Sequence, residues 1–384
     1  MTLHEVLTAR VERGELPGAV ALVARGDDVR VDAVGTTAFG GAEPMRRDTV
    51  FRIASLTKPL LAALTMTLVE ADVLDLEEPV HKLLPELAGQ RVLARPDGPL
   101  DDTVPLARPL TVADLLTFRM GSGMVTEPVY NPPWPVLAEL REREIVSGPP
   151  YPPSPLTPDE WIRRFGAVPL MYQPGERWQY NTGSDVLGVL LARAAGKPLG
   201  EVFREWLLDP LGLRETGFTL PAGRARGLPP LYGTDQESGT MVEVPGSAPE
   251  TWTEPPVFPS GSGGLVSTVD EYHTFARMLL RKGVHGGTRI LSEKSVELMT
   301  SNQLTPDQIT GAGALLSGAG WGFGLAVVIA AGDLGHVGQY GWSGGSGTTW
   351  FNDPGEDLTA ILFTQVNDIL WNGTLTEFER QAHA

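Results

Sequence analysis

Strand-like segments lie near both ends of this 384-residue sequence, and helical segments interrupted by proline fill its middle. Near the N-terminus, residues 19–24 and 29–34 are apolar and β-branched, and the Arg-Gly-Asp-Asp segment between them predicts a hairpin. Near the C-terminus, short apolar runs alternate with turns at residues 321–330, 347–352 and 358–366. This distribution predicts an α+β fold in which a mainly helical insertion splits the sheet-forming domain.

We place the boundaries of the inserted domain where the amino-acid composition of the chain changes. Proline clusters separate helical stretches such as residues 185–195 and 199–208. We therefore predict one discontinuous domain, residues 1–85 with 258–384, and a second domain, residues 86–257.

Apolar spacing predicts the helices of the split domain. The segment from Leu60 to Leu76 is apolar on most faces, which indicates a largely buried central helix. Asp270 is placed to cap an amphipathic helix that runs to Arg281. Two more helices are predicted near the chain ends, at residues 3–13 and 375–381.

Charge and composition exclude several classes of function. With 30 basic and 47 acidic residues, the formal net charge of −17 repels phosphate backbones and anionic lipid, so we expect neither a nucleic-acid nor a membrane partner. The absence of cysteine excludes a cysteine nucleophile and thiolate metal sites. The histidines show no metal-binding spacing and no phosphate-binding loop is present, so neither a metal nor a cofactor is expected. The sequence lacks a secretory signal and a membrane-spanning run, which favours a cytoplasmic protein.

The sharpest local motif is Ser55-Leu56-Thr57-Lys58, at the start of the predicted central helix. A spacing of three residues places Ser55 and Lys58 on one helical face, and Pro59 favours a first helical turn. The helix dipole there stabilises negative charge on the serine, and a lysine whose charge is suppressed can accept the serine proton. The structural alternative is that Ser55 is an N-cap and Lys58 a solvated charge.

Two further segments carry groups suited to catalysis. Tyr180 precedes the helix at residues 185–195, where a phenolate beside a lysine can act as a general base, although a buried core tyrosine is the alternative. The glycine-dense segment 340–347 can aim N–H groups at an oxyanion. It also matches the G-x-S-x-G nucleophile elbow at Ser343, but no helix signature follows and only His383 lies downstream, so we assign Ser343 to a turn.

Four segments in order resemble motifs of the serine β-lactamase and penicillin-binding-protein superfamily. They are residues 51–58, 174–183, 260–268 and 340–354. Within that superfamily the chain looks most like the family VIII carboxylesterases, which are similar to class C β-lactamases. The resemblance covers nearly the whole chain and implies a β-lactamase-like fold, with an antiparallel sheet flanked by helices, a mainly α-helical domain, and the site in the groove between them.

The same resemblance implies a role for individual residues. Ser55 would be the nucleophile, Lys58 its proton acceptor, and Tyr180 the group that assists acylation and water activation. The backbone N–H groups of Ser55 and Gly345 would form the oxyanion hole. The segment Trp342-Ser343-Gly344 takes the place of the superfamily's Lys-Thr-Gly strand and would line the substrate.

Two positions depart from the superfamily's pattern. The usual Y-x-N has become Tyr180-Asn181-Thr182, so Asn181 or Thr182 replaces its asparagine only in part. Trp342 stands where β-lactamases and peptidases carry a lysine that attracts the substrate carboxylate. A neutral indole in an acidic protein disfavours anionic substrates and favours neutral esters.

We therefore expect a serine carboxylesterase that cleaves short-chain or small neutral esters through an acyl-enzyme on Ser55. A β-lactamase, a D-amino-acid peptidase or an acyltransferase with the same Ser-Lys-Tyr site is the alternative. A catalytically silent binding module is disfavoured, because it need not retain serine, lysine and tyrosine together. Proline-rich loops at residues 127–157 and 220–260 are candidates for lining the substrate pocket.

Overall fold

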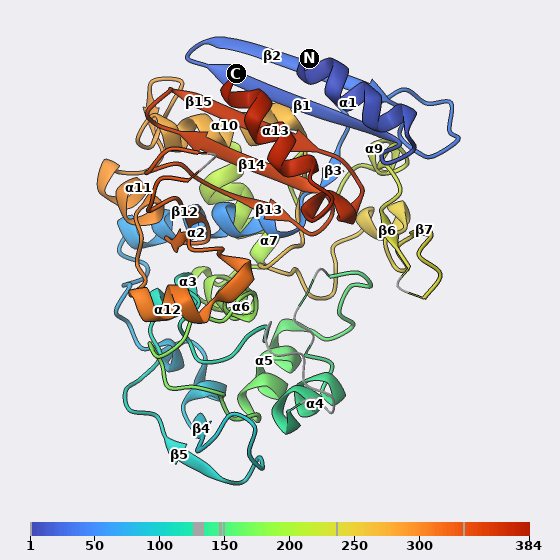
Figure 1. The fold of residues 1–384 in the computed structure, drawn as a ribbon. Coiled ribbons are helices and arrows are strands. Elements are labelled where there is room, and N and C mark those ends of the chain that lie inside the picture. Colours follow the sequence, from blue (N-terminus) through green and yellow to red (C-terminus); the bar gives the residue numbers. More distant parts are fainter. Residues whose placement is uncertain (1, 126–133, 146–147, 149, 236, 333–334) are drawn as a thin grey trace.

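A computed structural model describes residues 2–125, 134–145, 148, 150–235, 237–332 and 335–384. Its centre is a seven-stranded sheet with the strand order β11-β12-β13-β14-β15-β1-β2, in which every neighbouring pair is antiparallel. The N-terminal hairpin, β1 (Gly18–Arg25) and β2 (Asp28–Gly35), joins the sheet through the pairing of β1 with β15 (Leu358–Phe363). Strands from the two ends of the sequence therefore form one sheet (Figure 1), which confirms the α+β prediction.

The other strands form the C-terminal half of the sheet and four small two-stranded units. The sheet is completed by β11 (Gly320–Trp321), β12 (Ala326–Val327), β13 (Tyr340–Gly344) and β14 (Thr348–Asp353). The small units are β3 (Phe51–Arg52) with β8 (Val266–Ser267), β4 (Arg91–Leu93) with β5 (Thr103–Pro105), β6 (Tyr232–Thr234) with β7 (Met241–Glu243), and β9 (Val284–His285) with β10 (Thr288–Arg289).

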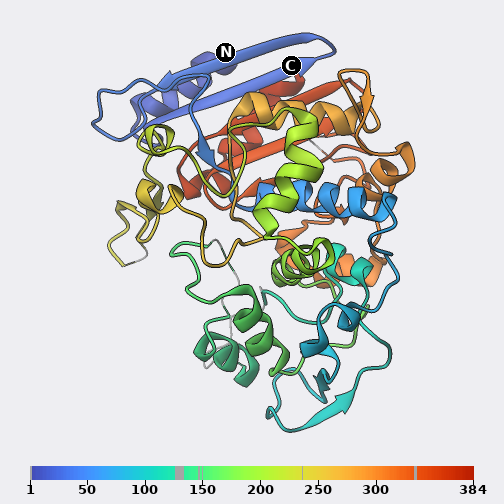
Figure 2. The ribbon, with the colours of Figure 1, turned by 180° about the vertical axis from the view of Figure 1, so that it is seen from behind.

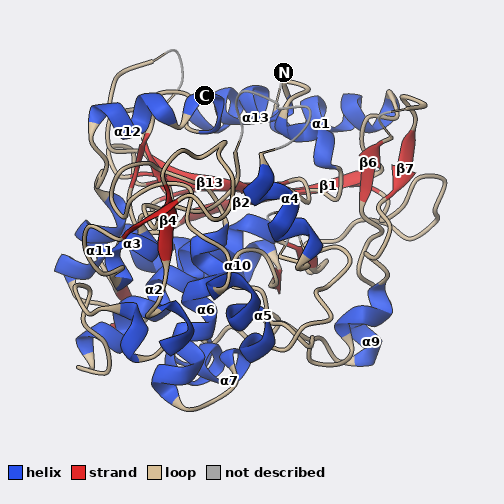
Figure 3. Ribbon diagram, turned by 90° about the horizontal axis from the view of Figure 1, so that it is seen from below, coloured by secondary structure: helices blue, strands red, loops and turns tan. Residues whose placement is uncertain are grey.

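Helices cover both faces of the sheet. Figure 3 shows α1 (Leu3–Glu12) and α13 (Thr374–His383) on one side, and α2 (Thr57–Glu70) and α10 (Val269–Leu280) on the other. Every residue of β14 and β15 is buried, as expected for strands covered on both faces. Two further helices, α11 (Glu293–Thr300) and α12 (Pro306–Gly311), lie between α10 and β11 in the chain.

The middle of the chain is mainly helical and lies partly below the sheet (Figure 1) and partly behind it, as Figure 2 shows from the other side. Its helices are α3 (Val112–Leu116), α4 (Pro135–Glu142), α5 (Pro158–Gly166), α6 (Thr182–Ala195), α7 (Leu199–Phe203), which continues as a π-helical turn (Arg204–Leu208), α8 (Asp209–Leu211) and α9 (Ala222–Ala225). All seven strands of the sheet lie outside residues 86–257. The domain boundaries at 85/86 and 257/258 stay a prediction.

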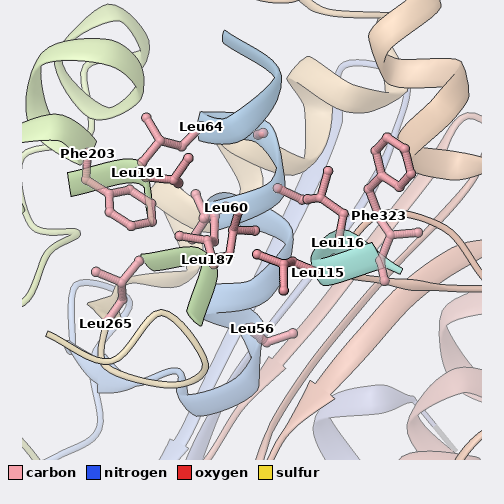
Figure 4. Packing of buried hydrophobic residues seen from close by; sticks show 14 of the residues in the cluster. Leu56, Leu60, Leu64, Leu115, Leu116, Leu187, Leu191, Phe203, Leu265 and Phe323 are labelled. Carbon is pink, nitrogen blue, oxygen red and sulfur yellow. The ribbon is translucent and has the colours of Figure 1, made fainter. Parts of the chain in front are cut away.

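The central helix α2 connects the sheet to the helical part. All twelve residues from Thr57 to Leu68 are buried. Figure 4 shows Leu60 and Leu64 of α2 packed with Leu187 of α6 and Leu115 of α3. Because full burial of each leucine contributes about 1.5–3 kcal/mol, this contact fixes the start of α2 relative to both α6 and the sheet.

Two details of the helices differ from the sequence prediction. The central helix ends at Glu70 rather than Leu76, because Asp72 adopts a positive φ of 55° that a helix cannot continue through. Helix α10 is capped by Thr268, whose Oγ1 accepts from the Glu271 N–H at 3.2 Å, two residues earlier than predicted. Asp270 is instead paired with Arg47 at 2.8 Å. Within the described ranges, no helix is both long and apolar enough to cross a membrane.

Candidate active site

Ser55 lies in a single 3₁₀ turn, Ala54–Leu56, that leads directly into α2. From Phe51 to Leu60 it is the only residue that is not fully buried. The preceding Ala54 has a φ of 42°, a left-handed conformation that costs of order 1 kcal/mol for a residue with a Cβ. The N-cap of α2 is Leu56 and no side chain caps it, so the N-cap alternative for Ser55 is wrong.

Lys58 is 1% exposed, and its ammonium nitrogen lies among three oxygen atoms. The distances from Nζ are 3.0 Å to Ser55 Oγ, 2.8 Å to Asn181 Oδ1 and 2.6 Å to the Ser262 carbonyl. An amide oxygen and a carbonyl oxygen only accept hydrogen bonds, whereas a hydroxyl also donates. A neutral Lys58 therefore gives its two N–H groups to Asn181 and Ser262 and presents its lone pair to the Ser55 hydroxyl.

The electrostatics of the site favour that neutral form. Burial lowers the pKa of Lys58 to about 7, and the carboxyl group of Asp185 opposes the shift. Burial in turn raises the pKa of Asp185, whose Oδ1 accepts from Ser260 Oγ at 2.8 Å and from the Ser262 N–H at 3.1 Å. A base with a pKa near neutrality is suited to proton transfer at physiological pH.

Tyr180 reaches the same point from the loop before α6. Its ring centroid is 4.5 Å from Lys58 Nζ, and its hydroxyl accepts from Trp342 Nε1 at 2.6 Å and lies close enough to Ser55 for that hydroxyl to affect its pKa. Burial raises the pKa of Tyr180 above its ordinary value. Burial thus favours the neutral phenol over the phenolate at rest, and the role of Tyr180 as a general base stays a prediction.

A strained turn follows Tyr180. Asn181 has φ 83° and ψ −66°, and the Thr182 N–H donates to the Tyr180 carbonyl at 3.3 Å, which together define a γ-turn of the rare form. The turn directs Asn181 Oδ1 to Lys58, while its amide Nδ2 is buried and has no hydrogen-bond partner among the described residues. Thr182 begins α6 and is buried.

The segment predicted to line the substrate lies in strand β13. Trp342, Ser343 and Gly344 all belong to this strand, so the assignment of Ser343 to a turn is wrong; its hydroxyl bonds to Thr349 Oγ1 of β14 at 2.8 Å. The absence of a following helix excluded a nucleophile elbow but did not require a turn, and the pairing of β13 with β14 gives the strand that the resemblance implied for residues 342–344. The actual turn begins at Gly345.

That turn packs against the chain just before the nucleophile. A Cβ on Gly344 would lie 2.3 Å from the Ile53 carbonyl oxygen, which leaves room only for glycine. Thr348 Oγ1 donates to the same oxygen at 3.1 Å, and Ser346 donates to the Arg52 carbonyl. Gly345 is therefore held beside the segment that carries Ser55.

A serine beside a buried lysine at the start of a central helix, with a tyrosine and a strand edge facing them, agrees with the comparison to known families. The family model described as Beta-lactamase matches residues 3–376. The chain belongs to the β-lactamase family.

Individual relatives span the whole β-lactamase-like chain. It is 35% identical to Mycobacterium tuberculosis protein Rv1367c, with 92% of this chain and 87% of that protein covered. It is 31% identical to esterase EstB of Burkholderia gladioli, with coverage of 99% and 94%. Among solved structures it resembles EstCE1, described as a hydrolase with promiscuous acyltransferase activity, with a TM-score of 0.81, 27% identity and coverage of 98% and 96%. The protein is thus a serine hydrolase of the β-lactamase fold.

Sequence reasoning missed three groups of this β-lactamase-family site. No role was predicted for three polar residues that lie around Lys58, which are Asp185, Ser260 and Ser262. The Ser-Gly-Ser-Gly-Gly segment at residues 260–264 was the available signal, since a Cβ on Gly261 would lie 2.4 Å from the Ser184 carbonyl oxygen. Such close backbone approach is what places the Ser262 carbonyl on Lys58.

The proline-rich loops approach the site in part. A Cβ built on Gly263 would lie 3.1 Å from Pro150 Cδ and 3.6 Å from the Ala54 carbonyl carbon. Pro150 therefore lies near the turn that carries Ser55. Pro255–Pro259 line a separate apolar cavity of about 560 Å³ together with α6 and α7. Parts of the predicted 127–157 loop, residues 127–133, 146–147 and 149, lie outside the described residues.

Proposed function

We propose that this protein is a carboxylesterase that forms an acyl-enzyme on Ser55. The observation that carries the proposal is the set of hydrogen bonds that orients Lys58 and Tyr180 beside Ser55. Trp342 Nε1 only donates, so the Tyr180 oxygen accepts from it and the Tyr180 proton is free for Ser55. The Ser55 proton then faces the lone pair of neutral Lys58, whose own N–H groups are taken by Asn181 and Ser262.

In the acylation step, Ser55 Oγ forms a bond to the ester carbonyl carbon while its proton moves to Lys58 Nζ. The carbonyl oxygen becomes an oxyanion that accepts from the backbone N–H groups of Ser55 and Gly345. When this intermediate collapses, the carbon–oxygen bond to the alcohol breaks, and the alcohol leaves with a proton from Tyr180, which Lys58 replaces. Water then attacks the acyl carbon and gives its proton to the Tyr180 oxygen while Tyr180 passes its own proton to neutral Lys58 Nζ. When this second intermediate collapses, the bond between the acyl carbon and Ser55 Oγ breaks, Lys58 returns the proton to Ser55 Oγ, and the acid is released.

The indole of Trp342 supports esters over β-lactams as substrates. It is half-buried and packs edge-on against Trp321, with ring centroids 4.8 Å apart. The neutral indole at this position offers no positive charge to pair with a substrate carboxylate. A neutral ester carries no charge that needs such a partner. The names of EstB and EstCE1, an esterase and a hydrolase, support the same substrate class.

The decisive experiment compares Ser55→Ala, Tyr180→Phe and the wild type on p-nitrophenyl acetate and butyrate and on nitrocefin. We expect both variants to lose ester turnover by about a thousandfold or more, because each breaks the proton path. A fluorophosphonate probe should add one mass increment to the wild type and none to Ser55→Ala. Undiminished ester turnover in Ser55→Ala, or nitrocefin turnover comparable to ester turnover, would overturn the proposal.

Acyl transfer is a second candidate, supported by the acyltransferase activity in the description of EstCE1. The acyl-enzyme is common to both reactions, and only the acceptor differs. Adding a primary alcohol during turnover of a vinyl ester measures the partition between acid and new ester. A product ratio that exceeds the molar ratio of alcohol to water would show that the acyl-enzyme prefers the alcohol, and more new ester than acid would assign acyl transfer as the main reaction.

A further inference from the structure

Two histidines and two carboxylates meet at the end of the β13–β14 pair that is remote from the Gly345 turn. They are His336, Asp353, Glu356 and His383, and one ligand atom of each lies within 4.8 Å of the others. Asp353 ends β14, Glu356 is in the β14–β15 turn, and His383 ends α13, which lies over the sheet in Figure 1. None of these groups touches the Ser55 site.

The tautomer of His383 is fixed by its neighbours. The Glu379 carboxylate only accepts, so it takes the amide N–H of Gln339 at 2.7 Å. The Gln339 oxygen therefore faces His383 Nε2, at 3.1 Å, and must receive its N–H. A neutral His383 consequently presents the lone pair of Nδ1, and that nitrogen is 3.3 Å from Glu356 Oε1.

In neutral His383 this contact sets the lone pair of Nδ1 against a carboxylate oxygen, and the other histidine lies close to the same carboxylate. His336 Nδ1 lies 2.5 Å from Asp353 Oδ2 and 3.4 Å from the same Glu356 Oε1. Two imidazole nitrogens thus converge on one carboxylate oxygen beside a second carboxylate. The repulsion at His383 Nδ1 is removed either by a second proton on that ring or by a cation bound among the four groups.

The site has the construction of a metal site rather than of a chance surface cluster. The Asp353 side chain is 1% exposed, and its second oxygen accepts from the Gly355 N–H at 2.8 Å, which fixes the carboxylate. His383 stacks on Phe351, with ring centroids 5.4 Å apart, and its Nε2 has the outer partner that metal-bound histidines ordinarily have. Arg25 pairs with the far oxygen of Glu356 and leaves Oε1 to the cluster.

We propose that His336, Asp353, Glu356 and His383 bind one divalent transition-metal cation, with Zn²⁺ the best match. Two imidazole nitrogens and two carboxylate oxygens are a donor set that Zn²⁺ accepts in tetrahedral geometry. Tetrahedral ligand bonds of about 2.0–2.2 Å place ligand atoms about 3.3–3.6 Å apart. The widest pair, within 4.8 Å, therefore closes by about 1.2–1.5 Å on binding, and the 2.5 Å pair of His336 and Asp353 opens by about 1 Å. The half-exposed ring of His336 is free to make that movement.

The role of this metal is structural. It joins the C-terminal end of α13 to the β14–β15 turn and to the segment before β13, so binding stabilises the packing of α13 on the sheet. The histidines are 47 residues apart, which explains why spacing in the sequence shows no motif.

The test uses the full chain without an affinity tag, dialysed to equilibrium against chelator-buffered Zn²⁺ and analysed for bound metal. We expect about one zinc per chain in the wild type and near zero in the double variant His336→Gln/His383→Gln. With zinc at roughly 100 times its dissociation constant, the midpoint of thermal unfolding should rise by about 3–5 °C in the wild type only. The matched control is His81→Gln, which changes an exposed histidine outside the cluster and should bind zinc like the wild type.

Substoichiometric zinc in the wild type would overturn the proposal, as would a double variant that is folded by circular dichroism and still binds one zinc. Zinc-independent thermal stability would show that protons on the histidines supply the charge instead. Ester hydrolysis should be the same with and without bound zinc, so this test is independent of the proposed function.

Discussion

The chemistry proposed for this site depends on how many hydrogen-bond acceptors surround one nitrogen. Lys58 Nζ faces two groups that only accept and one hydroxyl that can donate. A buried lysine without such neighbours is merely costly, because its charge loses water. In this site the two acceptors hold the N–H groups of neutral Lys58, so its lone pair points toward the Ser55 hydroxyl.

The activity should therefore rise with pH through about 7. Below that value most Lys58 is protonated and cannot accept the Ser55 proton, and above it most is neutral, since burial lowers its pKa to about 7. The measurement is kcat/KM between pH 5.5 and 8.5 on an ester that does not itself titrate. Lys58→Arg, which stays protonated throughout, should be inactive across the range. A flat wild-type profile would contradict the role of Lys58 as base.

Trp342 sets the charge preference of the substrate. Replacing it with lysine, Trp342→Lys, should raise nitrocefin turnover relative to neutral ester turnover by about tenfold, or ~1.4 kcal/mol, because a cation then faces the substrate carboxylate. Trp342→Phe is the control, since it removes the N–H donor to Tyr180 without adding charge and should slow both substrates alike. An unchanged ratio of kcat/KM values in Trp342→Lys would show that anionic substrates do not meet this position.

At the scale of elements, the sequence was informative where local pattern decides structure. The hairpin of β1 and β2, the buried helix α2 and the C-terminal strands follow from apolar period and turn residues. The Ser55–Lys58 contact follows from helical spacing alone. These features depend on residues close together in the chain.

What could not be predicted depends on contacts between distant segments. The γ-turn at Asn181, the carbonyl of Ser262 and the carboxyl of Asp185 converge on Lys58 from two separate stretches. Pairing with β14 likewise made Ser343 a strand residue despite its glycine neighbours. The resemblance to a superfamily supplied the long-range arrangement of Ser55, Tyr180 and Trp342 that residue patterns could not.

The γ-turn gives a prediction that separates backbone from side chain. Asn181→Gly keeps the positive φ but removes the amide, whereas Asn181→Ala removes the amide and adds strain. Both should lose turnover by about tenfold or more, because Lys58 loses an acceptor that orients it. Alanine should also cost about 1 kcal/mol more in free energy of unfolding than glycine, measured in urea. Wild-type turnover in Asn181→Gly would show that the amide does not orient Lys58.

At the scale of the whole molecule, one sheet joins segments that are more than 300 residues apart. Residue Leu22 of β1 is fully buried and lies opposite Ile361 of β15 and Val31 of β2. A substitution that destabilises β1 is therefore expected to destabilise the sheet that contains β13 and packs against α2.

Leu22→Ala should lower the free energy of unfolding by about 2–5 kcal/mol, because it leaves a cavity between β15 and β2. Val29→Ala, at a 36% exposed position of the same hairpin, should change it by less than about 0.5 kcal/mol. Thermal unfolding followed by circular dichroism and by loss of ester turnover should have the same midpoint in each protein. Activity lost well below the structural transition of Leu22→Ala would show that the site melts separately from the sheet.

The glycine contact between Gly344 and Ile53 has a practical consequence for anyone who wishes to alter this protein by directed evolution. Most variants in a library that randomises residues 51–58 and 342–348 will be inactive, because the backbones of these two segments are in direct contact. Pro150 meets this region only through its ring, near Gly263. Diversity concentrated at Pro150 can therefore explore new acids and alcohols while leaving the reacting groups intact.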